Sequence, residues 1–417
     1  MRLHMPGHKG CGPLGFEHLD LTEVAGADSL YEADGIIAAS EQNASWLFGC
    51  PTFYSTEGSS QCIRAMVHLA ALDARDKGKT PVIAAGRNAH KAFLSAAALT
   101  DSQVVWLYPK ETDSYLSCRV TAEDVAALEN VTAVYLTSPD YLGNMADIAA
   151  ISKVCRQKGI LLLVDNAHGA YLRFLEPSMH PMDLGADLCC DSAHKTLPVL
   201  TGGAYLHIRD AAWAPMARRA LALYGSTSPS YLILQSLDAA NRYLADGYMQ
   251  QLAQFVRQLE LTKQRLRNHG YRLCGNEPMK LTVQAKDFGF TGTQLAVLLR
   301  EQNVECEFAD PDYLVLMPAP GTDLVALESL LMRIPRQRAI TAASPAFCLP
   351  EKVLSIREAM FSPARQVAVV DSIGCILADA SVGCPPAVPI VVCGERIDQA
   401  AVDAFRYYGV ETVWVCK

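Results

Sequence analysis

The sequence lacks the features of several protein classes. Its formal net charge is -8 at pH 7 over 417 residues, so there is no excess of basic residues to bind nucleic acid or an anionic membrane. No uncharged run approaches the length of a membrane span, and the first ten residues lack the apolar stretch of a secretion signal. We therefore expect a soluble cytoplasmic protein that binds neither nucleic acid nor a membrane.

The cysteine patterns of zinc and redox sites are also missing. The 14 cysteines form no CxxC pair and no Cys/His cluster at zinc-site spacing. Cys62, Cys189 and Cys190 lie in apolar stretches, where a thiol behaves as a small hydrophobic side chain. Such thiols fit a reducing compartment. The sequence thus predicts no metal site and is consistent with a cytoplasmic location.

What the sequence does contain is an alternation of apolar runs with helix-like stretches between about residues 50 and 210. The runs are 81–85, 104–108, 133–136, 160–164, 187–190 and 204–208, and the helix-like stretches lie near 60–74, 122–130 and 147–158. This order predicts an α/β fold whose mainly parallel sheet is covered by helices on both faces. Residues that follow the strands would then face one crevice at their carboxyl ends.

The pattern changes after residue 210. Longer helical segments follow at 211–223, 231–245 and 249–269, and strand-like pieces at 279–284 and 313–317. We therefore predict a large domain with an N-terminal arm over residues 1–245 and a smaller C-terminal α+β domain over residues 246–417.

Two of the apolar runs end on charged residues. One is followed by Asp165, and another by Asp191 and, four residues later, Lys195. A lysine among small residues at the edge of a packed layer is desolvated, which favours its neutral, nucleophilic amine. An aspartate on a neighbouring strand can keep a proton on a pyridine nitrogen, so the two groups are the minimum for pyridoxal phosphate (PLP) chemistry. Ser192 and His194 share the turn of Lys195, although a lone Lys or Asp at a strand end is more often a solvated boundary residue.

Further candidates lie at helix starts. The segment 56–61 offers a glycine, the hydroxyls of Ser59 and Ser60, and unpaired amides that suit a phosphate group. The alternative for this segment is an ordinary N-cap. His90 follows the first apolar run and could stack on a pyridine ring or simply cap a helix.

Five segments of the chain resemble the Orn/Lys/Arg decarboxylase family of PLP enzymes, whose fold is that of aspartate aminotransferase, known as fold type I. In chain order they are 3–10 (LHMPGHKG), 165–169 (DNAHG), 192–198 (SAHKTLP), 227–231 (TSPSY) and 385–386 (PP) with 394–395 (GE). The resemblance implies that the large domain binds PLP. It also implies a homodimer, because family members build their active sites between two subunits.

The resemblance assigns roles to particular residues. It implies that Lys195 forms the Schiff base with PLP, that Asp165 binds the pyridine nitrogen and that His90 stacks on the ring. It implies phosphate contacts from Ser59, Ser60, Ser192 and His194, with Ser226 and Thr227 supplied across a dimer interface. The candidate catalytic residues are Lys195, His194, Asp165 and His90. The candidate cofactor-binding residues are Ser59, Ser60, His90, Asp165, His168, Ser192, His194, Lys195, Ser226 and Thr227.

The function that the resemblance implies is PLP-dependent decarboxylation of a basic amino acid, namely lysine, arginine or ornithine, to a diamine or agmatine in polyamine metabolism. The reaction would pass through an external aldimine and a quinonoid, with Lys195 or His194 returning the proton. Other fold-type-I activities, such as transamination or aldol cleavage, use the same anchors. A catalytically idle homologue that regulates a longer partner is a further alternative.

The chain departs from the family pattern at several points. Asn166 stands where the family usually has glutamate, which removes a negative charge beside the cofactor. Residues 391–393 (VVC) replace a segment in which a proline is common before the Gly-Glu pair. Because the sequence begins at the His-Met-Pro-Gly motif, we expect no N-terminal wing domain of the kind found in the long bacterial decarboxylases. No acid for the substrate side chain stands out, although Asp28, Glu32 and Glu395 are conceivable.

Overall fold

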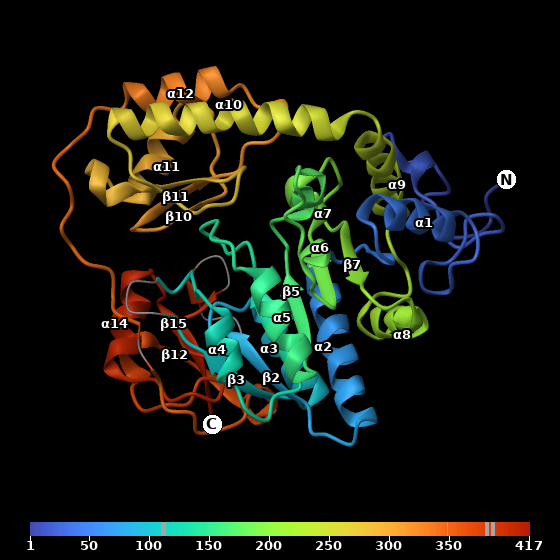
Figure 1. Ribbon diagram of the computed structural model, residues 1–417, viewed down its shortest axis with the longest axis horizontal. Helices are drawn as coiled ribbons and strands as arrows, with labels where there is room; N and C mark the ends of the chain where they lie inside the picture. Colours follow the sequence, from blue (N-terminus) through green and yellow to red (C-terminus); the bar gives the residue numbers. More distant parts are fainter. Residues whose placement is uncertain (110–113, 348, 380–382, 385–387) are drawn as a thin grey trace. The chain divides into compact units, whose positions relative to one another are not determined.

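The computed structural model describes residues 1–417 apart from 110–113, 348, 380–382 and 385–387 (Figure 1). Contacts within the chain divide it into two compact units. Unit 1 contains Met1–Ile83, Val125–Leu136 and Ile148–Met249, and unit 2 contains Ala84–Asp124, Thr137–Asp147 and Gln250–Lys417. The domain boundary near residue 245 stays a prediction. The Pro-Pro pair of the sequence motif lies outside the described residues.

The main sheet has seven strands in the order β1-β7-β6-β5-β4-β2-β3. They are β1 (Thr52–Ser55), β2 (Val82–Gly86), β3 (Gln103–Leu107), β4 (Ala133–Thr137), β5 (Leu161–Asp165), β6 (Leu188–Asp191) and β7 (Ala204–Ile208). Strands β5 and β6 are parallel, whereas β7 is antiparallel to both β6 and β1. The six predicted strands correspond to β2 through β7, and β1 is an additional strand that the sequence pattern missed.

Helices cover the part of this sheet that belongs to unit 1. They are α1 (Ile36–Phe48), α2 (Gly58–Asp76), α5 (Ile148–Lys158), α6 (Pro181–Leu184), α7 (Ala193–Thr196), α8 (Ala214–Tyr224) and α9 (Tyr231–Ala245). Helix α2 packs against β1, β5, β6 and β7, and α8 packs on α2. Every residue of β6, and every residue of β5 after its first, is buried. This near-continuous apolar pattern is typical of strands that are covered on both faces.

Unit 2 contains a second, antiparallel sheet in the order β10-β11-β9-β8. Its strands are β8 (Leu273–Cys274), β9 (Leu281–Gln284), β10 (Phe308–Ala309) and β11 (Tyr313–Leu316). Two strand pairs follow, β12 (Ala364–Ala368) with β15 (Thr412–Cys416) and β13 (Gly383–Cys384) with β14 (Val388–Pro389). The remaining helices are α3 (Lys91–Thr100), α4 (Ala122–Ala126), α10 (Tyr248–His269), α11 (Gly292–Arg300), α12 (Leu324–Arg333), α13 (Ile356–Phe361) and α14 (Gln399–Tyr407).

Helix α11 packs against β10 and β11 (Figure 1), so the second sheet has its own helical cover. Among the described residues, none of the helices combines the length and the apolar character that crossing a bilayer requires.

Candidate functional site

The ends of β5 and β6 lie side by side in unit 1. Asp165, the last residue of β5, is in register with Cys190 of β6. The amide of Asn166 continues the pairing by donating to the Cys190 carbonyl at 2.9 Å. Helix α7 begins at Ala193, directly after β6, and carries Lys195. The two chain segments that the sequence singled out therefore leave the sheet at neighbouring positions.

The Asp165 carboxylate is buried and is held by three donors. The Tyr135 hydroxyl donates to Oδ2 at 2.9 Å, the Cys190 thiol lies 3.6 Å from Oδ1, and the Ala167 amide donates to Oδ1 at 3.2 Å. Burial raises the pKa of Tyr135 and of Cys190 well above their ordinary values, so both side chains keep the protons that they donate. A carboxylate offers about four acceptor positions, which leaves room for one further N–H donor.

The Lys195 amine lies 3.1 Å from Nε2 of His168, which follows Asp165 in the β5 loop. An ammonium group has only donors, so His168 accepts through Nε2 in this contact. The neighbouring His194 bonds the Gly203 carbonyl through Nδ1 at 2.9 Å. A carbonyl accepts, which places a proton on Nδ1 of His194 and fixes the direction of its ring.

Three of the predicted phosphate ligands also come together. The Ser192 hydroxyl lies 2.8 Å from the Ser59 hydroxyl in the first turn of α2. A Cβ atom added to Gly58, at the start of the same helix, would lie 3.9 Å from Cε1 of His194. The residue before α2, Glu57, makes no side-chain cap hydrogen bond. The Gly58 amide donates to the Gly202 carbonyl at 2.7 Å. The amides that follow it in the first turn of α2 lie at a helix start, which favours an anion.

The segment with Ser226 and Thr227 lies near this helix start within the same chain. The Ser226 amide donates to the Glu57 carboxylate, and both Ser226 and Thr227 are exposed. A contribution of these two residues across a dimer interface stays a prediction. Ser60 also belongs to the first turn of α2, as the sequence suggested.

His90 lies in unit 2 and caps helix α3. Its Nδ1 accepts the Ala92 amide at 3.2 Å, which is the capping alternative that the sequence left open. The cap uses a nitrogen at the edge of the imidazole ring, whereas stacking on a pyridine ring would use one of its flat faces. The stacking role stays a prediction.

Two of the conceivable substrate-binding acids have structural partners instead. Glu395 is buried in unit 2 and forms an ion pair with Arg87 at 2.9 Å. Asp28 accepts the amides of Gly35 and Ile37 at 2.9 Å, at the start of α1. Burial by itself would raise the pKa of Asp28, but its amide hydrogen bonds lower it overall. Glu32 is exposed, and none of the three is singled out for a substrate.

Sequence reasoning missed four side chains around these strand ends. Tyr135 holds Asp165, and His180 and His207 both contact the Asp191 carboxylate at 3.1 Å. Asn166, known from the sequence only as a departure, donates to Asp191 at 2.7 Å. The sequence did contain one signal for these partners. Asp191 is a charged residue at the end of an apolar run, and a buried charge requires partners.

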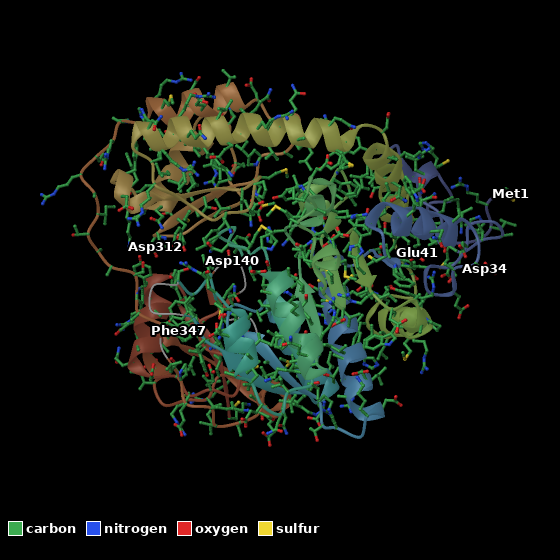
Figure 2. The ribbon with its side chains drawn as sticks, in the orientation of Figure 1. Met1, Asp34, Glu41, Asp140, Asp312 and Phe347 are labelled. Carbon is green, nitrogen blue, oxygen red and sulfur yellow. The ribbon has the colours of Figure 1, made fainter. Side chains whose placement is uncertain are left out.

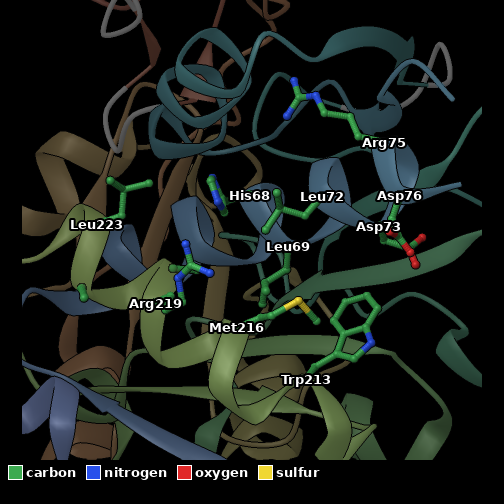
Figure 3. A pocket seen from close by; sticks show the side chains of 12 residues that line it. His68, Leu69, Leu72, Asp73, Arg75, Asp76, Trp213, Met216, Arg219 and Leu223 are labelled. Atoms are coloured by element: carbon green, nitrogen blue, oxygen red, sulfur yellow. The ribbon is translucent and has the colours of Figure 1, made fainter. Parts of the chain in front are cut away.

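A groove elsewhere in unit 1 is separate from this group of residues. It has a volume of about 1030 Å³ and lies between α2 and α8, with Leu72, Trp213, Met216 and Arg219 in its lining (Figure 3). It contains none of the predicted site residues.

A family model described as Orn/Lys/Arg decarboxylase, major domain, matches residues 15–275. The chain belongs to the Orn/Lys/Arg decarboxylase family. It is therefore an amino-acid decarboxylase, a carbon–carbon lyase, and the resemblance seen in the five sequence segments is confirmed.

Full-length relatives and a solved structure agree with this family. The uncharacterized protein YaaO of Bacillus subtilis is 30% identical over 96% of this chain and 89% of its own length. An arginine decarboxylase of Bacillus cereus is 30% identical over 94% of this chain and 93% of its own. Lysine decarboxylase A from Pseudomonas aeruginosa has a TM-score of 0.79 at 17% identity, covering 100% of this chain and 78% of that chain. The structural likeness confirms the predicted fold class, PLP fold type I.

The family implies PLP as the cofactor, and the residues present fit it. Asp165 retains one acceptor position for a ring N–H. The start of α2 and the hydroxyls of Ser59 and Ser192 offer donors of the kind that a phosphate group requires. Lys195 supplies a primary amine in α7, directly after β6.

Proposed function

We propose that this enzyme decarboxylates lysine, arginine or ornithine to a diamine or agmatine with PLP as its cofactor. The family and the arginine decarboxylase of Bacillus cereus support the reaction class. The observation that carries the proposal is the pairing of β5 with β6, which brings a three-donor carboxylate and a lysine amine onto adjacent loops. When bound, PLP supplies a protonated ring that takes up the electron pair released as carbon dioxide leaves.

Asp165 acts as the acceptor for the ring N–H. Its three donors come from Tyr135, Cys190 and Ala167, and all of them are neutral. They stabilise the carboxylate without neutralising its charge, so the charge remains available to the protonated ring nitrogen. A carboxylate paired with an arginine would be far less effective in this role.

His168 prepares the Lys195 amine. Because Nε2 of His168 accepts from the amine at 3.1 Å, it can take up a proton and leave a neutral nitrogen that attacks an aldehyde. Nδ1 of His194 is committed to the Gly203 carbonyl, which leaves Nε2 of that ring for the cofactor or the substrate. Lys195 and His194 are both candidates for the proton that replaces the carboxylate on the substrate carbon.

Ser59, Ser60 and Ser192 bind the phosphate group together with the amides at the start of α2. The direct contact between the Ser59 and Ser192 hydroxyls supports this assignment. Ser226 and Thr227 are exposed next to the same helix start, which suits a contribution to a second subunit's site. We therefore include a homodimer with shared sites in the proposal, with His90 as the residue that stacks on the ring.

The proposal is tested by supplying PLP-loaded protein with each of the three basic amino acids and measuring carbon dioxide and amine. We expect turnover of at least one of them, and Lys195→Ala should abolish it together with the visible absorbance of bound PLP. Lys153→Ala, which changes an exposed lysine of α5, is the matched control and should behave as the parent. Asp165→Ala should fold but lose turnover.

Two outcomes contradict this function. Keto acid formation from the same substrates, without carbon dioxide, would make the enzyme an aminotransferase. Turnover by Lys195→Ala at the parent rate would remove the assigned role of that lysine.

A further inference from the structure

The side chain of Asp191 is completely buried at the end of β6, four residues before Lys195. On Oδ2 it contacts Nε2 of His180 and Nε2 of His207, both at 3.1 Å. On Oδ1 it accepts from Asn166 Nδ2 at 2.7 Å, with the Cys189 thiol at 3.8 Å. These four contacts account for all of the acceptor positions of a carboxylate.

The protonation of the group follows from its neighbours. Nδ1 of His180 accepts the Met182 amide at 3.3 Å, so the proton of this imidazole is on Nε2 and is donated to Asp191. Burial by itself would raise the pKa of Asp191, but the imidazoles of His180 and His207 outweigh it and hold the pKa below its ordinary value. Burial lowers the pKa of His207 and raises that of Cys189. The Asp191 carboxylate is therefore surrounded by donors on both of its oxygens.

The same atoms have the separations of a candidate metal site. One ligand atom each from His180, Asp191 and His207 lie within 4.8 Å of one another. A metal would need the lone pair of Nε2 on His180, and that nitrogen carries the proton because Nδ1 is used as an acceptor. The geometry is that of a hydrogen-bonded group.

This group joins the two loops of the proposed active site. Asn166 directly follows Asp165, and Asp191 directly precedes the turn that contains Ser192 and Lys195. The loops are connected once through the backbone, by the Asn166 amide and the Cys190 carbonyl, and a second time through the Asn166 and Asp191 side chains. The two loops are therefore held together at two points.

We propose that Asn166 and Asp191 form a positioning pair that sets the separation between the Asp165 carboxylate and the Lys195 amine. This inference rests on the proposed function, because those two groups have to hold opposite parts of one cofactor. Misplacement of reacting groups by about 1 Å can lower a rate by about a hundredfold.

The pair also explains why asparagine replaces the glutamate that is usual in the family. Asp191 remains ionised, so a carboxylate at position 166 would place a second buried negative charge at hydrogen-bonding distance from it, which is strongly unfavourable. An amide at position 166 donates to Asp191 instead. The residue at 166 is therefore matched to the aspartate at 191 in this chain.

An exchange of isosteric side chains tests the pair. Asn166→Asp places two carboxylates face to face, and Asp191→Asn removes the charge that accepts from the two histidines. In the double variant, Asn166→Asp with Asp191→Asn, the amide oxygen at 191 can accept from both histidines while its NH₂ group donates to position 166. The double variant therefore keeps the hydrogen bonds between positions 166 and 191, and its negative charge lies at position 166 in place of position 191.

The readouts are the affinity for PLP, measured from the visible absorbance on titration, the pH profile of that absorbance, and kcat and KM separately. For Asn166→Asp we expect PLP affinity and kcat to fall by about tenfold to a hundredfold, with KM little changed. The double variant should recover to within about threefold of the parent, a difference of well under 1.4 kcal/mol. Asn166→Ala, which removes the connection without adding charge, provides the same test if the charged variant does not fold.

Several results would overturn the inference. A purely structural pair would lower the unfolding midpoint of the single variants but leave PLP affinity, its absorbance and kcat of the folded protein unchanged. Stoichiometric zinc in the parent, lost in Asp191→Asn, would make the group a metal site. PLP affinity and absorbance are measured without substrate, so they decide the inference even if none of the basic amino acids is turned over.

Discussion

Asp191 in unit 1 and Glu395 in unit 2 are both buried carboxylates, but they are stabilised in different ways. Asp191 accepts from two imidazoles, an amide and a thiol, and its pKa lies below its ordinary value because the imidazoles outweigh burial. Glu395 depends on one cation, Arg87, and on the Val392 amide. Burial raises the pKa of Glu395 despite that cation. Donors on both oxygens of Asp191 thus hold its charge better than two donors on one oxygen hold that of Glu395, although one of the two is a cation.

The two ways of stabilising a buried carboxylate suit the places of Asp191 and Glu395 in the fold. Asp191 lies beside the proposed active site. An additional cation there would attract the negatively charged groups of the cofactor and of the substrate. Glu395 lies in the Gly-Glu motif, and its partner Arg87 also donates to the carbonyls of Pro389 and Ile390. The Arg87–Glu395 pair therefore joins segments that are 308 residues apart in the sequence, and its role is to hold unit 2 together.

Removing the cation of this ion pair should have the largest effect. Arg87→Met leaves the Glu395 carboxylate buried without its partner, and breaking a buried pair in this way costs about 3–5 kcal/mol. Arg87 also lies over the Trp106 ring at 5.3 Å, a contact that methionine only partly replaces. The free energy of unfolding in urea measures the loss.

The matched control is Arg365→Met, since Arg365 is an exposed residue of β12. Its effect should stay within about 0.5 kcal/mol, as for most surface substitutions. Equal unfolding midpoints for the two variants would show that the Arg87–Glu395 pair does not contribute to stability.

Glu41 of α1 is a third buried acid (Figure 2). Its protonation changes between acidic and neutral pH, so it extends the comparison to the pH dependence of stability. Burial raises its pKa from 4.5 to about 7, although Arg218 contacts it at 2.6 Å. Between these values the unfolded chain has lost the proton that the folded chain keeps, so stability falls as the pH rises from 4.5 to about 7. The loss amounts to about 3 kcal/mol.

Glu41→Gln should remove this pH dependence, whereas Glu32→Gln, at an exposed position, should keep it. Asp191 contributes in the opposite direction, because a lowered pKa gives stability that is present above the ordinary value and is lost as the pH falls. Unfolding free energies at a series of pH values separate the two. A Glu41→Gln variant with the slope of the parent would contradict the assignment.

The sequence predicted the strands and the family better than it predicted the partners of each residue. Lys195 and Asp165 were chosen as candidates because Asp165 directly follows one apolar run and Lys195 lies in the turn after another. The alternation of strands and helices predicted that both lie at one edge of a sheet. Strand β1 was missed because its polar ends, Thr52 and Ser55, leave only two consecutive apolar residues as a signal.

The histidines of the Asp191 group could not be predicted in the same way. His207 lies within β7 and His180 precedes α6, and a single histidine in an apolar segment has no signature of its own. Their common partner is defined only when β6 pairs with β7. The role of Asn166 was similarly invisible, because it depends on which strand lies beside β5.

The smallest expected effect concerns two buried tyrosines of the main sheet. The hydroxyl of Tyr135 in β4 donates to Asp165 at 2.9 Å, whereas the hydroxyl of Tyr205 in β7 is buried without a hydrogen-bond partner among the described residues. Tyr135→Phe should therefore lower the free energy of unfolding by about 1–2 kcal/mol, because the buried carboxylate loses a donor. Tyr205→Phe removes an unsatisfied group of the same shape and should be neutral or stabilising. If both variants lost the same free energy of unfolding, the hydrogen bond from Tyr135 to Asp165 would contribute nothing to stability beyond the burial of a tyrosine hydroxyl.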